Sequence, residues 1–247
     1  MDSKLVLVIV GLLIGLSKGG LGGPVPVALV TPLLSQIMPA AQAVGIVLPL
    51  LIFADGFALW AYWRQWNGLY IRRMLPLGIV GVVMGVVLLA ALAPHDTLLR
   101  RVLGLFTLTI ILYKTLGGQL SRVKYQSRAW HAYLAGWASG FGSALANVGA
   151  PPFTAYMLLQ EVSPRVFVGT TTLFFAIINV LKLPGFLSAG VLNLTQLASL
   201  AWVALLIPLG VWLGRRFVSS VNPHVFEWIM LAALFLASLS LLLSPAR

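Results

Sequence analysis

Long stretches of apolar residues, separated by short polar segments, make up most of this chain. Six of them approach the length of about 20 residues that a helix needs to cross a bilayer. These stretches cover residues 40–63, 73–93, 97–116, 165–187, 194–213 and 223–243. The pattern predicts an all-α integral membrane protein with six spanning helices.

Two further apolar stretches are interrupted halfway along. Leu5 to Leu16 would form a helix only about 18 Å long, against a hydrocarbon core of about 30 Å, before glycines and a proline follow. Residues 129–160 repeat this design. We expect residues 4–37 and 129–160 each to form a re-entrant helical hairpin with both ends on one membrane face. A single long helix unwound in its middle is the alternative.

The two interruptions are copies of each other within a longer internal repeat. Gly22-Gly23-Pro24 overlays Gly149-Ala150-Pro151, and the spanning stretches that follow overlay at similar offsets. The sequence therefore predicts one membrane domain made of two repeats, residues 1–116 and 129–247, joined by a basic cytoplasmic linker over 117–128. Each repeat contains one re-entrant hairpin and three spanning helices.

Charge indicates how the repeats are related. The loop with Arg72 and Arg73 is basic, whereas its counterpart at 188–194 carries no charge. Arg215 and Arg216 are basic, whereas their counterpart at 87–93 is neutral. Since basic loops stay in the cytoplasm, equivalent loops lie on opposite faces, the repeats are inverted and both termini lie outside. Arg100 and Arg101 run against this pattern, and we expect them to snorkel or to face the core.

Composition narrows the function classes. The 247 residues are 60% hydrophobic and 9% charged, with a mean hydropathy of +1.00, which excludes an ordinary soluble domain. The net charge of +11 lies at the ends of apolar runs, which favours membrane topology over nucleic-acid binding. The chain has no cysteine, no metal-ligand cluster, no nucleotide loop and no nucleophile–base set. We expect no cofactor, no enzyme activity and no removable signal peptide.

Paired interrupted helices in matching halves point to a transporter's binding site. Helix N-termini at the breaks would offer free N–H groups to an anion, and glycine lets a ligand approach the backbone. The candidate binding glycines are Gly19, Gly20, Gly22, Gly23 and Gly149. Tight helix packing is the alternative role of these glycines.

Lysine 18 lies inside the first break, where it either attracts the anion or snorkels out of the membrane. Asp55 is the one acid well inside a long apolar run. It either forms an internal ion pair with a lysine or arginine, or carries a proton coupled to transport.

Further candidate binding residues carry amide, hydroxyl or amino groups. They are Asn147, Thr170, Thr171, Asn179 and Lys182. Asn147 could cap the broken helix, and the threonines either donate to substrate oxygens or bond back to their own helical turn. Asn179 is expected deep in the membrane and Lys182 near its outer edge.

The glycine motifs resemble those of a known family. Residues 15–24 read Gly-Leu-Ser-Lys-Gly-Gly-Leu-Gly-Gly-Pro. Together with residues 135–152 and the run Gly169-Thr170-Thr171, they resemble the TauE/SafE family of sulfite exporters along almost the whole chain. The resemblance implies a bacterial inner-membrane exporter of sulfur-containing anions such as sulfite or organosulfonates.

The sequence as a whole favours a secondary transporter that moves a small anion by rocking one half against the other. Its expected partners are that anion and the lipid bilayer. A passive anion channel and an intramembrane enzyme acting on lipid are the alternatives. Concentrative uptake, ohmic current and product formation without solute movement would distinguish the three.

Overall fold

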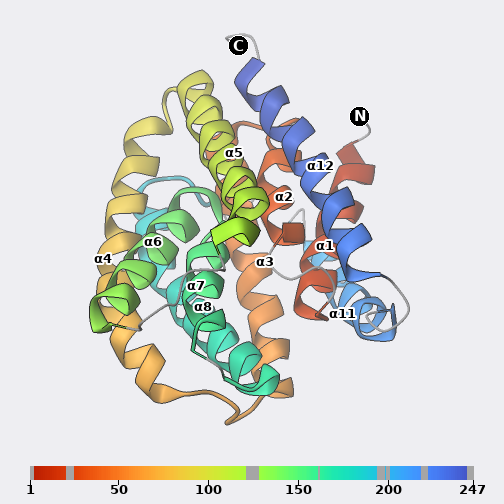
Figure 1. The fold of residues 1–247 in the computed structure, drawn as a ribbon. Helices are drawn as coiled ribbons and strands as arrows, with labels where there is room; N and C mark the ends of the chain where they lie inside the picture. Colours follow the sequence, from red (N-terminus) through yellow and green to blue (C-terminus); the bar gives the residue numbers. More distant parts are fainter. Residues whose placement is uncertain are drawn as a thin grey trace.

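The structure is a computed structural model that describes residues 3–20, 25–120, 128–160, 162–193, 198, 201–217 and 222–243. Every regular element in these ranges is a helix (Figure 1). The helices are α1 (Ser3–Lys18), α2 (Val25–Leu34), α3 (Ala40–Ala61), α4 (Gly68–Leu92), α5 (Asp96–Leu120), α6 (Ala129–Ala146), α7 (Ala150–Leu158), α8 (Pro164–Ser188), α10 (Ala201–Ala204), α11 (Leu206–Phe217) and α12 (Pro223–Leu243).

Four of the described helices are long and apolar enough to cross a membrane. They are α3, α4, α8 and α12, and they confirm helices over four of the six predicted stretches. The chain is therefore a multi-pass membrane protein. Helix α5 covers the stretch 97–116, but the side chains of Tyr113 and of 116–120 lie outside the described residues. The span over 97–116 stays a prediction.

The predicted single helix over 194–213 is wrong in its described part. Residues 201–204 form α10, Leu205 is a turn, and α11 begins at Leu206. The cause is Pro208, whose ring would clash with the carbonyl of Ala204 in a continuous helix and which has no N–H to donate. Residues 194–197, 199 and 200 lie outside the described residues.

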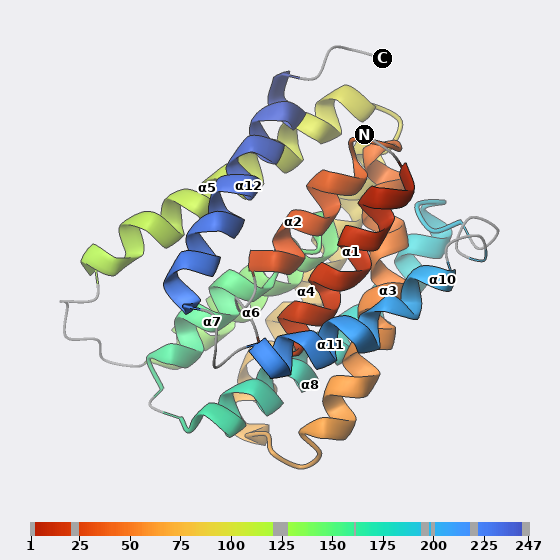
Figure 2. The same ribbon diagram turned by 90° about the vertical axis from the view of Figure 1, so that its right-hand side faces the viewer.

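The interrupted segments form pairs of short helices. Helices α1 and α2 lie side by side and run in opposite directions, as do α6 and α7 (Figures 1 and 2). Helix α1 begins and α12 ends at the same end of the molecule. The connections from α3 to α4 and from α7 to α8 lie at the opposite end (Figure 1).

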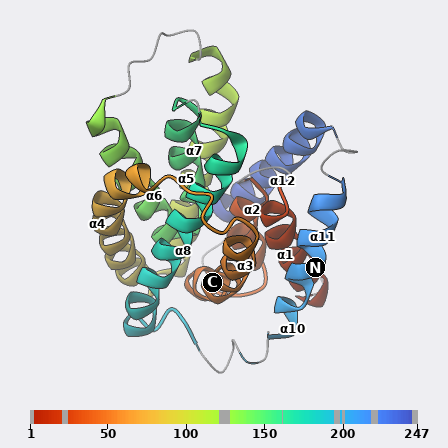
Figure 3. The ribbon, with the colours of Figure 1, turned by 90° about the horizontal axis from the view of Figure 1, so that it is seen from below.

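Helices α3 and α8 occupy the middle of the molecule. The pair α1–α11 lies on one side of them and the pair α4–α6 on the other (Figure 3). Both flanking pairs pack through glycines. A Cβ added at Gly15 would lie 2.6 Å from Gly210 Cα, and one at Gly140 would overlap the Gly78 carbonyl. The helix backbones therefore touch, as small residues allow inside membranes.

Arginine 100 faces the core, which resolves the conflict that it posed for the charge pattern. Its guanidinium donates to the carbonyl oxygens of Ser35 and, at 3.0 Å, Met38 beyond the end of α2. Asp96 accepts from Arg100 Nε at 2.6 Å and from the Ala40 N–H at 2.7 Å. One ion pair on α5 therefore binds the backbone between α2 and α3.

Candidate functional site

The second helix break contacts both α2 and α3. Thr31 Oγ1 on α2 donates to the Ala146 carbonyl at the end of α6, at 3.0 Å. Asn147 follows in the left-handed conformation, with φ of 58°, and caps the C-terminus of α6. Its Nδ2 donates to the Val44 carbonyl on α3 at 2.9 Å. Asn147 thus ends one helix and joins the second break to α3.

The glycines of the breaks have different roles. Gly20 has a φ of +99°, a conformation that glycine adopts without strain, and a Cβ there would meet nothing within 4 Å. Gly19 packs on α11, since a Cβ would lie 2.6 Å from the Val211 carbonyl oxygen. Gly149 packs on α6, where a Cβ would lie 2.8 Å from Ser143 Cβ. Gly22 and Gly23 lie outside the described residues.

Lysine 18 and Asp55 form an ion pair between the first break and α3. The other oxygen of Asp55 accepts a hydrogen bond from Asn179 Nδ2 on α8 at 2.7 Å. Asp55 and Asn179 are both 2% exposed, whereas the Lys18 side chain is 18% exposed. The carboxylate therefore links α1, α3 and α8, and Lys18 is the most exposed member of the network.

Lysine 182 is fully buried, so its predicted place near the outer edge is wrong. Its Nζ donates to Ser143 O at 3.0 Å, to Ser143 Oγ at 3.1 Å and to Asn147 Oδ1 at 2.9 Å. The cause is the position of the second break, which lies beside this turn of α8 and presents three acceptors to the amino group. Lys182 therefore holds α8 against the end of α6.

Basic side chains outnumber acidic ones in this region. Lys18 and Lys182 are basic, and Asp55 is the one acid that contacts the network within the described residues. Lys182 has no carboxylate within ion-pair distance among those residues. Two amino groups beside one carboxylate favour a ligand with one negative charge.

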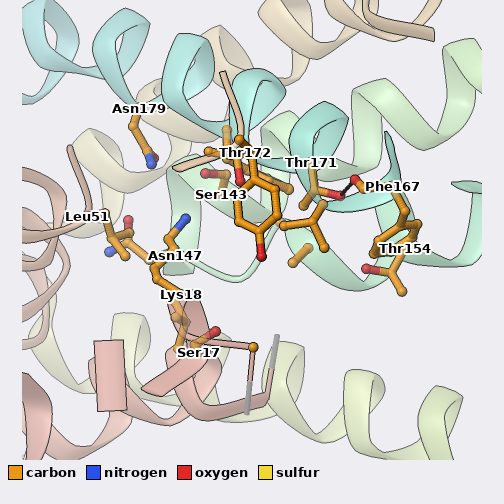
Figure 4. Close-up of a pocket in the computed structure, with 17 residues that line it drawn as sticks. Ser17, Lys18, Leu51, Ser143, Asn147, Thr154, Phe167, Thr171, Thr172 and Asn179 are labelled. Atoms are coloured by element: carbon orange, nitrogen blue, oxygen red, sulfur yellow. Dashed lines mark hydrogen bonds between the residues drawn. The ribbon is translucent and has the colours of Figure 1, made fainter. Parts of the chain in front are cut away.

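A cavity of about 290 Å³ opens between the breaks and α8. Figure 4 shows Ser17 and Lys18 on one side of it and Asn179, Thr172 and Thr171 of α8 on another. The residues that line it are Ser17, Lys18, Gly20, Val27, Leu51, Tyr62, Ser143, Asn147, Gly149, Ala150, Thr154, Phe167, Val168, Thr171, Thr172, Phe175 and Asn179. Polar groups from both breaks thus meet apolar walls.

Six predicted site residues line this cavity: Lys18, Gly20, Asn147, Gly149, Thr171 and Asn179. Gly19, Asp55 and Lys182 lie behind its wall. Thr170 points elsewhere, because its hydroxyl donates to Val166 O at 2.6 Å and accepts from the Asn67 N–H at 2.9 Å. Thr171 also bonds back to its own helix, at Phe167 O.

Five polar residues of the lining were not among the predicted site residues. They are Ser17, Tyr62, Ser143, Thr154 and Thr172. The signal for Ser17 and Ser143 was their place inside the two breaks, and Thr172 continues the run of threonines. Thr154 lies one turn into α7, and its neighbours in the sequence give no indication of the cavity.

The described residues contain no group of three or more histidine, aspartate or glutamate side chains that could hold a metal ion. Asn179 Oδ1 is buried and accepts no hydrogen bond from the described part of the chain. The cavity therefore offers ammonium, amide and hydroxyl groups rather than the carboxylate ligands of a hard cation.

Comparison with known proteins identifies the family. The family model described as "Sulfite exporter TauE/SafE" matches residues 7–241, which include both breaks and every element that lines the cavity. Searches for similar curated proteins and for similar solved structures found no match. The match extends over nearly the whole chain, and on this ground the chain belongs to the TauE/SafE family of sulfite exporters.

Proposed function

We propose that the protein is a secondary transporter of a small sulfur-containing anion, sulfite or an organosulfonate, which it exports across the inner membrane. The observation that carries this proposal is the cavity between the two helix breaks, where Lys18 and Asn147 face one space. With both amino groups protonated, Lys18, Lys182 and Asp55 leave one positive charge for the anion to balance. The apolar walls of Leu51, Val168 and Phe175 suit a small organic group.

The position of the cavity indicates which side of the membrane it opens to in this conformation. Its lining extends to Tyr62 and Phe167, near the end of the molecule that carries Arg64 and Arg165. Basic residues mark this end as cytoplasmic. Towards the other end, the bonds Thr31 to Ala146 and Asn147 to Val44 join the second break to α2 and α3. We therefore assign the structure to an inward-facing state.

An asymmetry between the halves supports alternating access. Helix α12 packs along α2, whereas a groove of about 450 Å³ lies between α5 and α7, which are their counterparts in the repeat. Thr109 and Ile110 of α5 line the groove opposite Pro152 and Ala155 of α7. Inverted repeats exchange such contacts between their two states. In the outward-facing state α5 would close on α7 and α12 would leave α2.

This movement can be tested by a cross-link. Gln36 lies beyond the end of α2, and its Oε1 is 3.1 Å from Ser240 Oγ on α12. Joining Gln36→Cys to Ser240→Cys with a short reducible reagent should stop transport in liposomes, and reduction should restore it. The chain has no cysteine of its own. Full transport with the cross-link in place would contradict the proposed movement of α12.

Substrate binding is tested by thermal stabilisation of the purified protein. A ligand at 100 times its dissociation constant adds about 2.7 kcal/mol to the free energy of unfolding. We expect sulfite or methanesulfonate to raise the melting temperature, with chloride at equal ionic strength as the control. A melting temperature that none of the sulfur anions raises above the chloride control would contradict the proposed substrate class.

Membrane topology gives an independent test of the inverted repeats. Asn67 lies in the α3–α4 connection, and its repeat counterpart Asn193 follows α8. We expect Asn67→Cys to be labelled from the cytoplasm and Asn193→Cys from outside, in intact cells against permeabilised ones. Labelling of both positions from the same side would exclude inverted repeats.

A further inference from the structure

The amino group of Lys182 occupies a site that suits both of its protonation states. As an ammonium group it has three donors for its three acceptors, Ser143 O, Ser143 Oγ and Asn147 Oδ1. As a neutral amine it has two donors, which serve the Ser143 and Asn147 carbonyl oxygens. The Ser143 hydroxyl can then turn and donate to the amine lone pair. Neither state leaves a buried polar group unpaired.

Aspartate 55 lacks this freedom. Its two oxygens already accept from the Lys18 ammonium and from Asn179 Nδ2. A proton on Asp55 would remove the negative charge that pairs with the Lys18 ammonium in the core. The pairing therefore fits the ion-pair interpretation of this residue better than the proton-carrier one.

The groups around Lys182 are few. The elements packed against α8 are α3, α4, α6 and α7. Asp55 is the one titratable residue of α3, and Lys18 of α1 lies beyond it in the same network. Residues 82–89 of α4 and 139–147 of α6 carry no titratable side chain, and α7 carries Tyr156 alone. The charge of an anion in the cavity therefore acts on Lys182 with little competition.

Lysine 182 also has a short connection to the cavity. It does not line the cavity, but both of the side chains that hold it, Ser143 and Asn147, do. With an anion bound, two ammonium groups balance one carboxylate and one anion. With the cavity empty, loss of the proton from Lys182 leaves the Lys18–Asp55 pair neutral. The binding of an anion and the protonation of Lys182 therefore favour each other.

We propose that Lys182 carries a proton that is bound and released together with the anion, so that the protein cotransports protons. The proton comes from a hydronium ion that reaches the cavity from bulk water. The Ser143 hydroxyl gives its proton to Lys182 Nζ and takes one from the hydronium ion, which leaves as neutral water, and the same steps run in reverse when the anion leaves. This inference rests on the proposed anion transport and adds its coupling ion.

The test counts protons during anion binding. The purified protein is titrated with methanesulfonate in a calorimeter, in two buffers of different ionisation enthalpy. The difference between the two measured heats gives the number of protons taken up per anion. Methanesulfonate is the anion of a strong acid, so that a proton taken up binds to the protein. We expect uptake to approach one proton per anion as the pH rises and the empty protein releases the Lys182 proton. The affinity should then fall by up to about tenfold per pH unit.

Two variants locate the proton. Lys182→Arg keeps the positive charge but cannot be deprotonated, so it should bind the anion with no linked uptake. Ser143→Ala removes the hydroxyl acceptor and should slow proton-driven flux while leaving the Lys182 contact to the Ser143 carbonyl. The comparison of wild type and Lys182→Arg can be repeated with sulfite. Sulfite itself exchanges a proton with the buffer, but this adds equally to the proton count of both proteins and cancels in their difference.

The outcomes separate this inference from the function on which it rests. Anion binding without proton uptake by the wild type, or with unchanged uptake by Lys182→Arg, overturns the assignment of the proton to Lys182 and leaves the transport proposal standing. Failure of both methanesulfonate and sulfite to bind contradicts the transport proposal and the coupling with it. If Lys182→Arg does not fold, the methanesulfonate titration of the wild type decides alone whether any proton is taken up.

Discussion

Replacing Asp55 by asparagine is expected to lower the melting temperature in detergent by about 6–20 °C. Removing one member of a buried ion pair costs roughly 3–5 kcal/mol, and each kcal/mol shifts the midpoint of a chain of this size by about 2–4 °C. The cost is high here because Asp55 is 2% exposed and is the one acid contacting Lys18 in the described network. The variant leaves Lys18 and Lys182 with no carboxylate in the described network.

A second substitution shows whether charge is the cause. Lys18→Met combined with Asp55→Asn removes both members of the pair, and it should recover most of the lost stability, because a buried pair can be replaced by neutral groups at little cost. The double variant should still fail to bind sulfite or methanesulfonate, since Lys18 lines the cavity. A double variant as unstable as Asp55→Asn alone would contradict the ion-pair explanation.

A matched control is available on the rim of the molecule. Lys114 pairs with Glu227 between α5 and α12, but these side chains are 33% and 29% exposed. Partly exposed pairs contribute about 0–1 kcal/mol. Lys114→Met should therefore shift the melting temperature by no more than about 4 °C. A shift as large as that of Asp55→Asn would mean that burial does not determine the effect.

The other large effect is expected at the contact between α4 and α6. A Cβ at Gly140 would overlap the carbonyl oxygen of Gly78, and a shift of backbone is the only relief. Gly140→Ala should therefore destabilise the protein by about 3 kcal/mol or more, as overpacking of a rigid core does. Thermal unfolding of the purified variant measures this loss.

The control for Gly140→Ala is a glycine-to-alanine substitution at an exposed position of a helix. Gly56 lies on the exposed side of α3, where an added Cβ meets nothing within 4 Å. Gly56→Ala should leave stability unchanged or raise it by up to about 1 kcal/mol, because alanine favours the helix. Equal effects of the two substitutions would show that helix propensity, rather than backbone contact, governs both positions.

The sequence predicted the helices and their interruptions because hydrophobic length and proline or glycine placement act locally. The stretch 40–63 corresponds to α3 at Ala40–Ala61, and the second break falls between Ala146 and Ala150 as expected. Pro208 shows the limit of hydropathy. It ends a helix inside a run that is apolar throughout, and its effect on the backbone is steric rather than hydrophobic.

The partners of the charged residues could not be predicted. Asp55 pairs with Lys18 rather than with Lys182, and Arg100 caps the backbone after α2. These choices depend on how each helix is rotated about its axis. Helices that are apolar on all sides carry no periodic pattern from which that rotation can be read. The burial of Lys182 is undetermined by the sequence for the same reason.

The glycine contact between α1 and α11 has a consequence for biosynthesis. Gly15 leaves the ribosome well before its neighbour Gly210, because 210 − 15 = 195 residues separate them in the sequence. At about 5–20 residues per second, roughly 10–40 s pass between them. During this interval α1 lacks the helix that covers its glycine face. The nascent first break must therefore be held by the insertion machinery or by lipid until α11 is made.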